Sequence, residues 1–242
     1  MKFIYETDRL ILKLLGEDDA PAVLQFYKQN RNVFEPYETI HPEQFYTVAY
    51  QRTLMNCELS LTLKHSLIRF YIFRRENPDE IIGTVCFRNI NRSTYYSCET
   101  GYRFSPAYWH RGYAREALAF GIQLMFEEFH LHRIEAAVMP KNTASIRLLE
   151  SLDFQQEGVA REYALIQGKW EDHIRFALIR PSVDTSSQTS PLTAGTAFPS
   201  GTVENQKYQP LLFPASDKPP ALLRTAPVLP ASPVLRRKDT GN

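Results

Sequence analysis

The chain has 242 residues, of which 28 are Lys or Arg and 27 are Asp or Glu, so its formal net charge is +1. This length suffices for one domain with a buried core and an extension. Nucleic-acid-binding proteins usually carry a strong basic excess or a basic stripe, so the near-neutral charge gives no sign of a nucleic-acid partner.

The spacing of the cysteines and histidines and the hydropathy of the chain argue against disulfide-rich, metal-binding and membrane proteins. Cys57, Cys86 and Cys98 show no C-x-x-C spacing, which argues against a disulfide framework or a zinc site. The 6 histidines lack H-x-x-x-H spacing, so we expect no metal. No signal-peptide pattern and no run of 18 apolar residues is found, so the sequence predicts a cytoplasmic protein without a membrane partner.

The first part of the chain predicts strands and helices in alternation. Residues 7–14 are a strand candidate, and a helix is expected to begin near Asp18 and Asp19, because acidic residues favour the positive end of a helix. A second helix is expected at residues 43–58. Residues 67–75 and 81–90 are β-rich, and the intervening segment 76–80, with its Asn-Pro-Asp, predicts a hairpin turn.

Residues 95–104 alternate with the period of a strand. One face carries Tyr96, Cys98, Thr100, Tyr102 and Phe104. The other face carries Ser97, Glu99, Gly101 and Arg103.

The following segments complete an α/β pattern. A loop at residues 105–111 leads into a helix at 112–129, which is apolar on most of its circumference and should be buried on a sheet. We then expect a strand at 134–139, a short helix capped by Asn142, and a closing hairpin of 154–166 and 169–179. This order predicts an α/β (α+β) fold, a mixed sheet with helices on both faces.

The composition changes near Pro181. Ten of the 16 prolines lie from Pro181 onward, among Ser, Thr, Ala and Gly without periodicity. Such a segment cannot bury enough apolar surface to offset its ordering entropy. We therefore expect a folded domain at residues 1–182 and a disordered Pro/Ser-rich tail at 183–242. The apolar patches at 210–213 and 227–235 leave docking on a partner open, although the composition favours a solvated tail.

The motif Tyr108-Trp-His-Arg-Gly-Tyr-Ala-Arg-Glu-Ala-Leu118 joins a strand to a buried helix. The N–H groups of a first helical turn lack intrahelical partners and the macrodipole is positive there, so the motif suits a pyrophosphate. Gly112 permits close backbone approach, and Arg111 and Arg115 add charge. Any buried helix can begin with Gly, so the motif alone is weak, and Walker or three-glycine Rossmann patterns are absent.

A second motif follows the strand predicted at residues 134–139. Asn142 and Ser145, at positions i and i+3, share one face of a first helical turn. Helix capping by itself accounts for Asn142.

Taken together, five ordered motifs resemble the GNAT acetyltransferase superfamily. They are Arg111-Gly-Tyr-Ala-x-Glu-Ala-Leu, Leu131-His-Arg-Ile-Glu-Ala, Asn142-x-x-Ser-Ile-x-Leu-Leu-Glu, Phe154-x-x-Glu-Gly and Gly168-x-Trp-x-Asp. The segment Thr7-Asp-Arg-Leu-Ile-Leu resembles the family's first strand. The resemblance is closest to the Rim-type ribosomal-protein alanine/serine N-terminal acetyltransferases and runs through about residues 5–181.

The resemblance implies a mostly antiparallel GNAT-type sheet with a splayed central strand pair, and acetyl-CoA bound where strands 95–104 and 134–139 separate. The pantetheine would pair with the backbone near Arg103 and Phe104, Asn142 would hold its arm, and Ser145 would approach the thioester sulfur. The acceptor amine would enter near residues 34–38 and 167–170. The amides implied for the pyrophosphate are those of His110, Arg111, Gly112, Tyr113, Ala114 and Arg115.

Amine acetylation needs a base, because a protonated amine cannot attack. A strand-edge N–H would stabilise the oxyanion, and Ser145 would assist the leaving thiolate by a hydrogen bond. No covalent enzyme intermediate is required. Glu99 is the candidate base, with Glu38 as its competitor unless Glu38 is a plain surface carboxylate, and Tyr102 is expected to pack in the core.

Two residues depart from the family pattern. His110 stands where the family usually has a small residue, so the loop is expected to be tighter or lined by a side chain. Asp153 stands where the family has Gly, and we expect a positive φ there.

Three functions follow from this sequence. The first is acetyl transfer from acetyl-CoA to a protein N-terminus. The second is transfer to a small amine such as a polyamine or an aminoglycoside. The third is a catalytically weak acyl-CoA-binding protein that uses its tail to interact. A homodimer is compatible with all three.

Overall fold

The structure, a computed structural model, describes residues 1–181. The expected tail, residues 183–242, lies outside the described residues. The main helices are α1 (Ala20–Gln29), α2 (Arg31–Phe34), α3 (Val48–Leu63), α4 (Tyr113–Glu127) and α5 (Thr143–Glu150). Short 3-10 helices span Glu17–Asp19, Glu35–Tyr37, Glu43–Tyr46 and Pro106–Tyr108. The strands are β1 (Ile4–Glu6), β2 (Leu10–Lys13), β3 (Leu67–Arg74), β4 (Asn77–Asn91), β5 (Ser97–Phe104), β6 (Arg133–Val138), β7 (Gln155–Ile166) and β8 (Lys169–Ile179).

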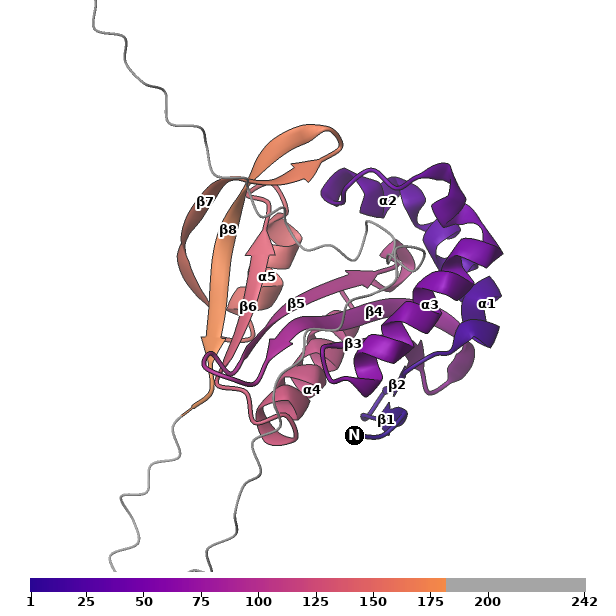
Figure 1. The fold of residues 1–242 in the computed structure, drawn as a ribbon, viewed down its shortest axis with the longest axis horizontal. Coiled ribbons are helices and arrows are strands. Elements are labelled where there is room, and N and C mark those ends of the chain that lie inside the picture. Colours follow the sequence, from indigo (N-terminus) through magenta and orange to yellow (C-terminus); the bar gives the residue numbers. More distant parts are fainter. Residues whose placement is uncertain (182–242) are drawn as a thin grey trace, which may run out of the picture. The chain divides into compact units, whose positions relative to one another are not determined.

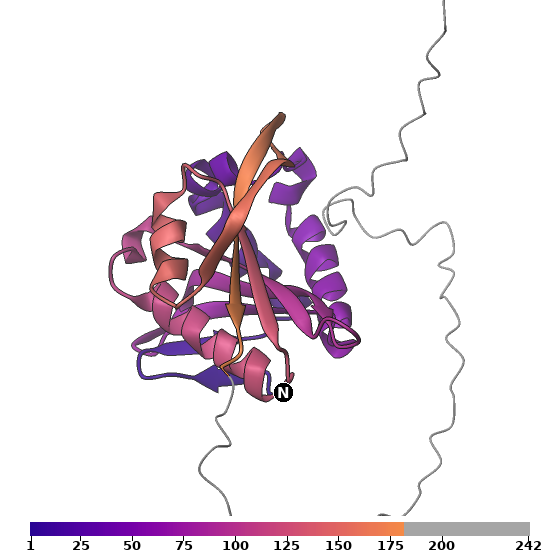
Figure 2. The same ribbon diagram turned by 90° about the vertical axis from the view of Figure 1, so that its left-hand side faces the viewer.

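The strands form one eight-stranded sheet in the order β1-β2-β3-β4-β5-β6-β8-β7. Every neighbouring pair is antiparallel except β5 and β6, which run parallel. Helices α1 and α3 cover one face of the sheet, and α4 and α5 cover the other (Figures 1 and 2). The mixed, mostly antiparallel architecture expected from the sequence is confirmed.

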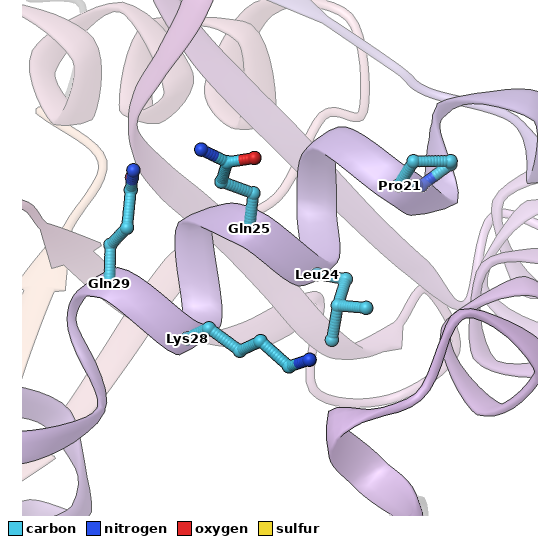
Figure 3. A pocket seen from close by; sticks show the side chains of 5 residues that line it. All are labelled: Pro21, Leu24, Gln25, Lys28 and Gln29. Atoms are coloured by element: carbon cyan, nitrogen blue, oxygen red, sulfur yellow. The ribbon is translucent and has the colours of Figure 1, made fainter.

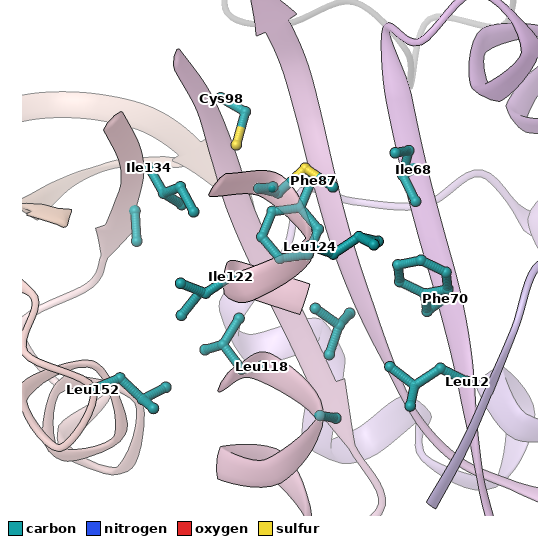
Figure 4. Close-up of a cluster of buried hydrophobic side chains, with 14 of the residues drawn as sticks. Leu12, Ile68, Phe70, Phe87, Cys98, Leu118, Ile122, Leu124, Ile134 and Leu152 are labelled. Atoms are coloured by element: carbon teal, nitrogen blue, oxygen red, sulfur yellow. The ribbon is translucent and has the colours of Figure 1, made fainter. Parts of the chain in front are cut away.

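The main core lies between α4 and the central strands, as Figure 4 shows. Leu118 and Met125 of α4 are fully buried, as are Phe70 and Phe87 of the sheet. A Cβ at Gly121 would lie 2.5 Å from the Phe87 ring, so glycine is what allows α4 to approach the sheet this closely. The helix that the sequence predicts at residues 112–129 is thus buried as expected.

Three predicted boundaries are wrong in detail. Residues 7–14 are not one strand, because Thr7 N donates to Leu10 O at 2.9 Å and turns the chain between β1 and β2. The helix predicted at 43–58 begins later, where the Thr47 side chain caps Tyr50 N, and it runs to Leu63. The turn predicted at 76–80 is shorter, because Asn77 already pairs with Arg74.

Asp153 adopts the positive φ expected for it, 64°, just after α5. A side chain in this left-handed conformation costs about 1 kcal/mol, and a carboxylate also opposes the negative end of the helix. Asp153→Gly should therefore raise the free energy of unfolding by about 0.5–1 kcal/mol in urea titrations. Glu150→Gly, inside α5, should instead lower it by about 1 kcal/mol. A destabilised Asp153→Gly variant would contradict this account.

Candidate active site

The parallel strands β5 and β6 pair over only a short stretch and then separate. Their register joins Ser97 to Arg133, Cys98 to Ile134 and Glu99 to Glu135, and no later pair follows. Both strands continue, β5 to Phe104 and β6 to Val138, and each stays paired with its outer neighbour. The two strands therefore diverge beyond Glu99 and Glu135 (Figure 1), which confirms the expected splay. Backbone groups along the inner edge of β5 are left without a strand partner.

The start of α4 presents unpaired amides beside this gap. Gly112 is the N-cap at φ 79° and makes no capping hydrogen bond through a side chain. Within residues 1–181, the backbone N–H groups of residues 110–115 find no acceptor. His110, Arg111, Gly112 and Arg115 are exposed, and Tyr113 and Ala114 are partly buried. Free N–H groups at the positive end of a helix form an anion site, which we call the cradle, residues 110–115.

The backbone of His110 is strained, and its side chain is exposed. Its φ is 59°, in the left-handed region, and the residue is exposed. Glycine adopts this conformation freely, whereas other residues adopt it at a cost. A histidine in place of the family's small residue therefore costs conformational free energy in the backbone at position 110.

Arg9 holds the cradle in place, a role that none of the sequence motifs indicated. Its Nη1 donates to Arg111 O at 2.9 Å, and its Nε donates to Glu116 Oε2 at 2.7 Å. Thr7 Oγ1 donates to the other Glu116 oxygen at 2.6 Å. Although burial raises the pKa of Glu116, the hydrogen bonds from Thr7 and Arg9 lower it below its usual range, so the carboxylate stays ionised.

Arg9→Ala should weaken acetyl-CoA binding about tenfold, because the loop that positions the cradle loses its brace. The dissociation constant measured by calorimetry checks this. The matched control is Arg52→Ala, since Arg52 is an exposed arginine on α3, away from the cradle. Equal affinities for the wild type and Arg9→Ala would show that the loop holds its shape without Arg9.

Asn142 and Ser145 lie at the start of α5. Asn142 Oδ1 accepts from Ser145 N at 3.1 Å, which confirms helix capping for that oxygen. Ser145 Oγ lies 2.6 Å from the Tyr102 hydroxyl oxygen, and Ser145 O lies 3.2 Å from the same atom. The Tyr102 ring packs against the core as expected, but its hydroxyl reaches α5. Burial raises the pKa of Tyr102, and the Ser145 hydrogen bond only partly offsets this.

Glu99 and Arg103 flank Gly101 on the face of the sheet that α3 covers. Gly101 is in register with Cys86 and Arg69, and Arg69 forms an ion pair with Glu58 of α3 at 2.7 Å. Glu99 is held by Arg88 at 3.2 Å and by Asn89 at 3.2 Å, and its side chain is 25% exposed. The structure therefore places Glu99 beside the point where β5 and β6 separate, and its carboxylate forms an ion pair with Arg88 there.

Glu38 is not a surface carboxylate. Its side chain is only 13% exposed, and it is ion-paired with Arg103 and lies 2.7 Å from His41 Nε2. Burial raises the pKa of Glu38, but Arg103 and the hydrogen bond from His41 lower it by more. The resulting pKa of Glu38 is about 2. A carboxylate of such low basicity is a poor general base at neutral pH.

The two segments expected at the acceptor entrance lie together. Gln167 Nε2, at the β7–β8 turn, donates to Glu35 O at 2.9 Å and to Glu38 O at 3.1 Å. Figure 1 shows the tip of this hairpin beside α2. The loop 34–38 and the turn 167–170 therefore lie in contact with each other.

Two surface hollows lie outside the cradle. One is lined by five residues of α1 alone, Pro21, Leu24, Gln25, Lys28 and Gln29 (Figure 3). The other is lined by Pro140, Lys141, Trp170, Glu171 and Asp172. Neither includes a cradle residue, and the second includes Trp170 of the turn 167–170. Within residues 1–181 no three His, Cys, Asp or Glu side chains are grouped to hold a metal, and no helix there is long and apolar enough to cross a membrane.

Comparison with known proteins decides the family. The sequence pattern of a family described as an acetyltransferase (GNAT) domain matches residues 9–155. The chain belongs to the GNAT acetyltransferase family. As a GNAT enzyme it is an N-acetyltransferase with acetyl-CoA as the acetyl donor, and the free amides of the cradle beside a gap between strands fit a diphosphate followed by an extended arm.

Relatives of this GNAT enzyme include ribosomal-protein acetyltransferases. The [ribosomal protein uS5]-alanine N-acetyltransferase of Escherichia coli K12 is 35% identical over 178 residues, which are 72% of this chain and 90% of that protein. The ribosomal-protein-S5-alanine acetyltransferase of Vibrio fischeri superposes with a TM-score of 0.70 at 30% identity, over 74% and 97% of the chains. Mycobacterium smegmatis RimJ, solved with CoA-disulfide, has a TM-score of 0.66 at 25% identity, over 70% and 81%.

Proposed function

We propose that this enzyme acetylates the N-terminal α-amine of a protein, of the ribosomal-protein type, in the cytoplasm. The observation that carries this proposal is the 35% identity over 178 residues to the uS5-alanine N-acetyltransferase of Escherichia coli, which spans 90% of that enzyme.

The surface around the entrance supports a polypeptide acceptor. Tyr37 and Ile40 on the loop side are 41% and 64% exposed, and Leu165 and Trp170 on the hairpin are 45% and 51% exposed. Leu165 and Trp170 are directly opposed in the β7–β8 register. Exposed apolar and aromatic side chains favour contact with peptide side chains, whereas a polyamine offers few apolar groups to bind them.

For the cosubstrate we propose the cradle and its surroundings. The amides of residues 110–115 would bind the pyrophosphate, with Arg111 and Arg115 adding positive charge. Asn142 would hold the pantetheine arm beside β5, near Arg103 and Phe104. The Phe104 carbonyl already accepts from Trp109 Nε1 at 2.7 Å, so pairing there relies on the remaining backbone groups of β5.

The acetyl donor supplies a thioester, and residues of the chain prepare the attack on it. Glu99 would take a proton from the incoming ammonium, directly or through water, so that a neutral amine attacks the carbonyl carbon. Glu99 is preferred over Glu38 because the Glu38 pKa is about 2. Ser145 would donate a hydrogen bond to the departing sulfur.

The acceptor assay measures release of CoA thiol. We expect kcat/KM for a peptide with the N-terminus of a ribosomal protein, beginning with Ala or Ser, to exceed that for spermidine or an aminoglycoside by about 100-fold. The same peptide with a formylated N-terminus is the control and should give no turnover. Faster turnover of a small amine would assign the second function instead. Acetyl-CoA binding without turnover of any amine would assign a catalytically weak binding protein.

The role of Glu99 has its own readout. Glu99→Gln should lower kcat about 100-fold, with KM for acetyl-CoA within about twofold. Glu135→Gln is the matched control, because this carboxylate is directly opposite and is held by Arg133 and Arg175. An unchanged kcat in Glu99→Gln would exclude Glu99 as the base.

For the tail we propose no part in the chemistry. Deletion of residues 183–242 should leave kcat/KM for the best acceptor within about twofold of the full chain, because every residue of the proposed site lies in residues 1–182. An inactive truncated chain, if it remains folded by circular dichroism, would show that the tail contributes to the site.

A further inference from the structure

The Tyr102 hydroxyl meets Ser145 at the place where β5 and β6 have separated. Tyr102 lies on β5 beyond the last residue paired with β6, and Ser145 lies in the first turn of α5. Their side-chain oxygens are 2.6 Å apart although the residues are 43 positions apart in sequence. This contact joins the strand that lines the gap to the helix that carries the serine.

The hydrogen bond between the two hydroxyl groups is short, and either oxygen can be its donor. A Tyr hydroxyl has one proton, and its two neighbours are Ser145 Oγ at 2.6 Å and Ser145 O at 3.2 Å. Strong O–H···O hydrogen bonds measure about 2.7 Å, so the 2.6 Å contact is a strong one, with the proton of either Tyr102 or Ser145 between the two oxygens. With Tyr102 as the donor, the Ser145 hydroxyl proton is free to be donated elsewhere, and the Ser145 oxygen is polarised by the bond it accepts.

We propose that Tyr102 is a positioning residue, which donates a hydrogen bond to Ser145 Oγ and so directs the Ser145 hydroxyl proton at the sulfur of the leaving CoA thiolate. This inference rests on the proposed function, because it takes the Ser145 role from there. Because burial raises the pKa of Tyr102, its hydroxyl remains protonated at neutral pH and keeps donating.

Acetyl transfer leaves the Ser145 and Tyr102 side chains chemically unchanged. The C–N bond forms, the C–S bond breaks, and its electron pair goes to sulfur. The ammonium nitrogen loses two protons in all: one passes through Glu99 to solvent, and the other ends on the CoA sulfur. Ser145 and Tyr102 contribute hydrogen bonds that stabilise the charge on sulfur while it departs, and each keeps its own proton.

A double-mutant cycle tests the coupling. Ser145→Ala should lower kcat about 100-fold and Tyr102→Phe about tenfold, each with KM for acetyl-CoA within about twofold. The double variant should be no slower than Ser145→Ala, because Tyr102 acts through Ser145. Tyr95→Phe, an exposed phenol at 71%, is the control and should leave kcat unchanged. Multiplicative losses, or full activity in Tyr102→Phe, would overturn the proposal.

A change of leaving group separates positioning from support of the fold. Acetyl-seleno-CoA keeps the whole cosubstrate but releases a selenolate, which is a weaker base than a thiolate and needs less stabilisation. The kcat deficit of Tyr102→Phe should therefore shrink from about tenfold to about twofold with the selenoester. An equal deficit with both donors would mean that Tyr102 only supports the position of α5, and would overturn the proposal.

The test of Tyr102 does not depend on which amine is the natural acceptor. The variants are measured with whichever amine the wild type acetylates fastest, whether a peptide or a small amine. Preference for a small amine would refute the proposed function while the cycle still decides the role of Tyr102. A wild type that acetylates no amine would refute both.

Discussion

Gly112→Glu is expected to abolish acetyl-CoA binding, with a loss of affinity above about 1,000-fold, or about 4 kcal/mol. Gly112 has φ 79°, and a Cβ there would lie 3.2 Å from Arg9 Nη2, so any side chain is strained at this position. The added carboxylate would also repel the phosphates that we propose to bind at the free amides of residues 110–115. Calorimetric titration with acetyl-CoA measures the effect.

Gly112→Ala is the matched control for backbone strain. It should lower the free energy of unfolding by about 1 kcal/mol and weaken binding far less than Glu does, because it adds no charge. Thermal unfolding of both variants without ligand shows whether the fold survives. A folded Gly112→Glu variant with wild-type affinity would remove the cradle from the account.

Glu38→Gln is expected to lower the free energy of unfolding by about 3 kcal/mol at pH 7. The folded-state pKa of Glu38 is about 2, below its ordinary value of 4.5, because Arg103 and His41 favour the ionised form. A depressed carboxyl pKa contributes stability that is fully present above about pH 4.5 and is lost as the pH falls towards 2. Glu38→Gln also leaves Arg103 without its counter-ion.

Urea unfolding of both proteins between pH 7 and pH 3 tests this. The stability difference should be constant above about pH 5 and shrink below pH 4.5. Glu43→Gln is the control, since Glu43 is 85% exposed and 3.7 Å from Arg31, and should change little. If Glu38→Gln were fully stable but lost the acidic limb of its pH–rate profile, Glu38 would be the base instead of Glu99.

The fold was predictable where a pattern is local. Residues 97–104 alternate and α4 carries a broad apolar face, and both patterns follow directly from burial against neighbouring layers. The first strand was predicted wrongly because its turn uses a Thr7 side-chain hydrogen bond to Leu10 N and contains no glycine or proline. Boundaries set by single hydrogen bonds of this kind have no periodic signal.

Of the candidate site, only the free amides of residues 110–115 could be predicted from a local pattern. The cradle comes from six consecutive residues whose free amides follow from helix geometry alone. The side chains that support it do not: Arg9 and Glu116 are 107 positions apart, Arg103 and Glu38 are 65 apart, and Tyr102 and Ser145 are 43 apart. Such pairs form only when the sheet brings distant strands and helices together, so one sequence does not reveal them.

A crystal structure of the enzyme with CoA measures the central claim most directly. We predict pyrophosphate oxygens at about 2.7–3.2 Å from backbone nitrogens of residues 110–115. The pantetheine should then run along β5 into the space it leaves beside β6, towards Ser145. A diphosphate bound away from the start of α4, or β5 and β6 joined beyond Glu99 with the cosubstrate outside them, would contradict the account.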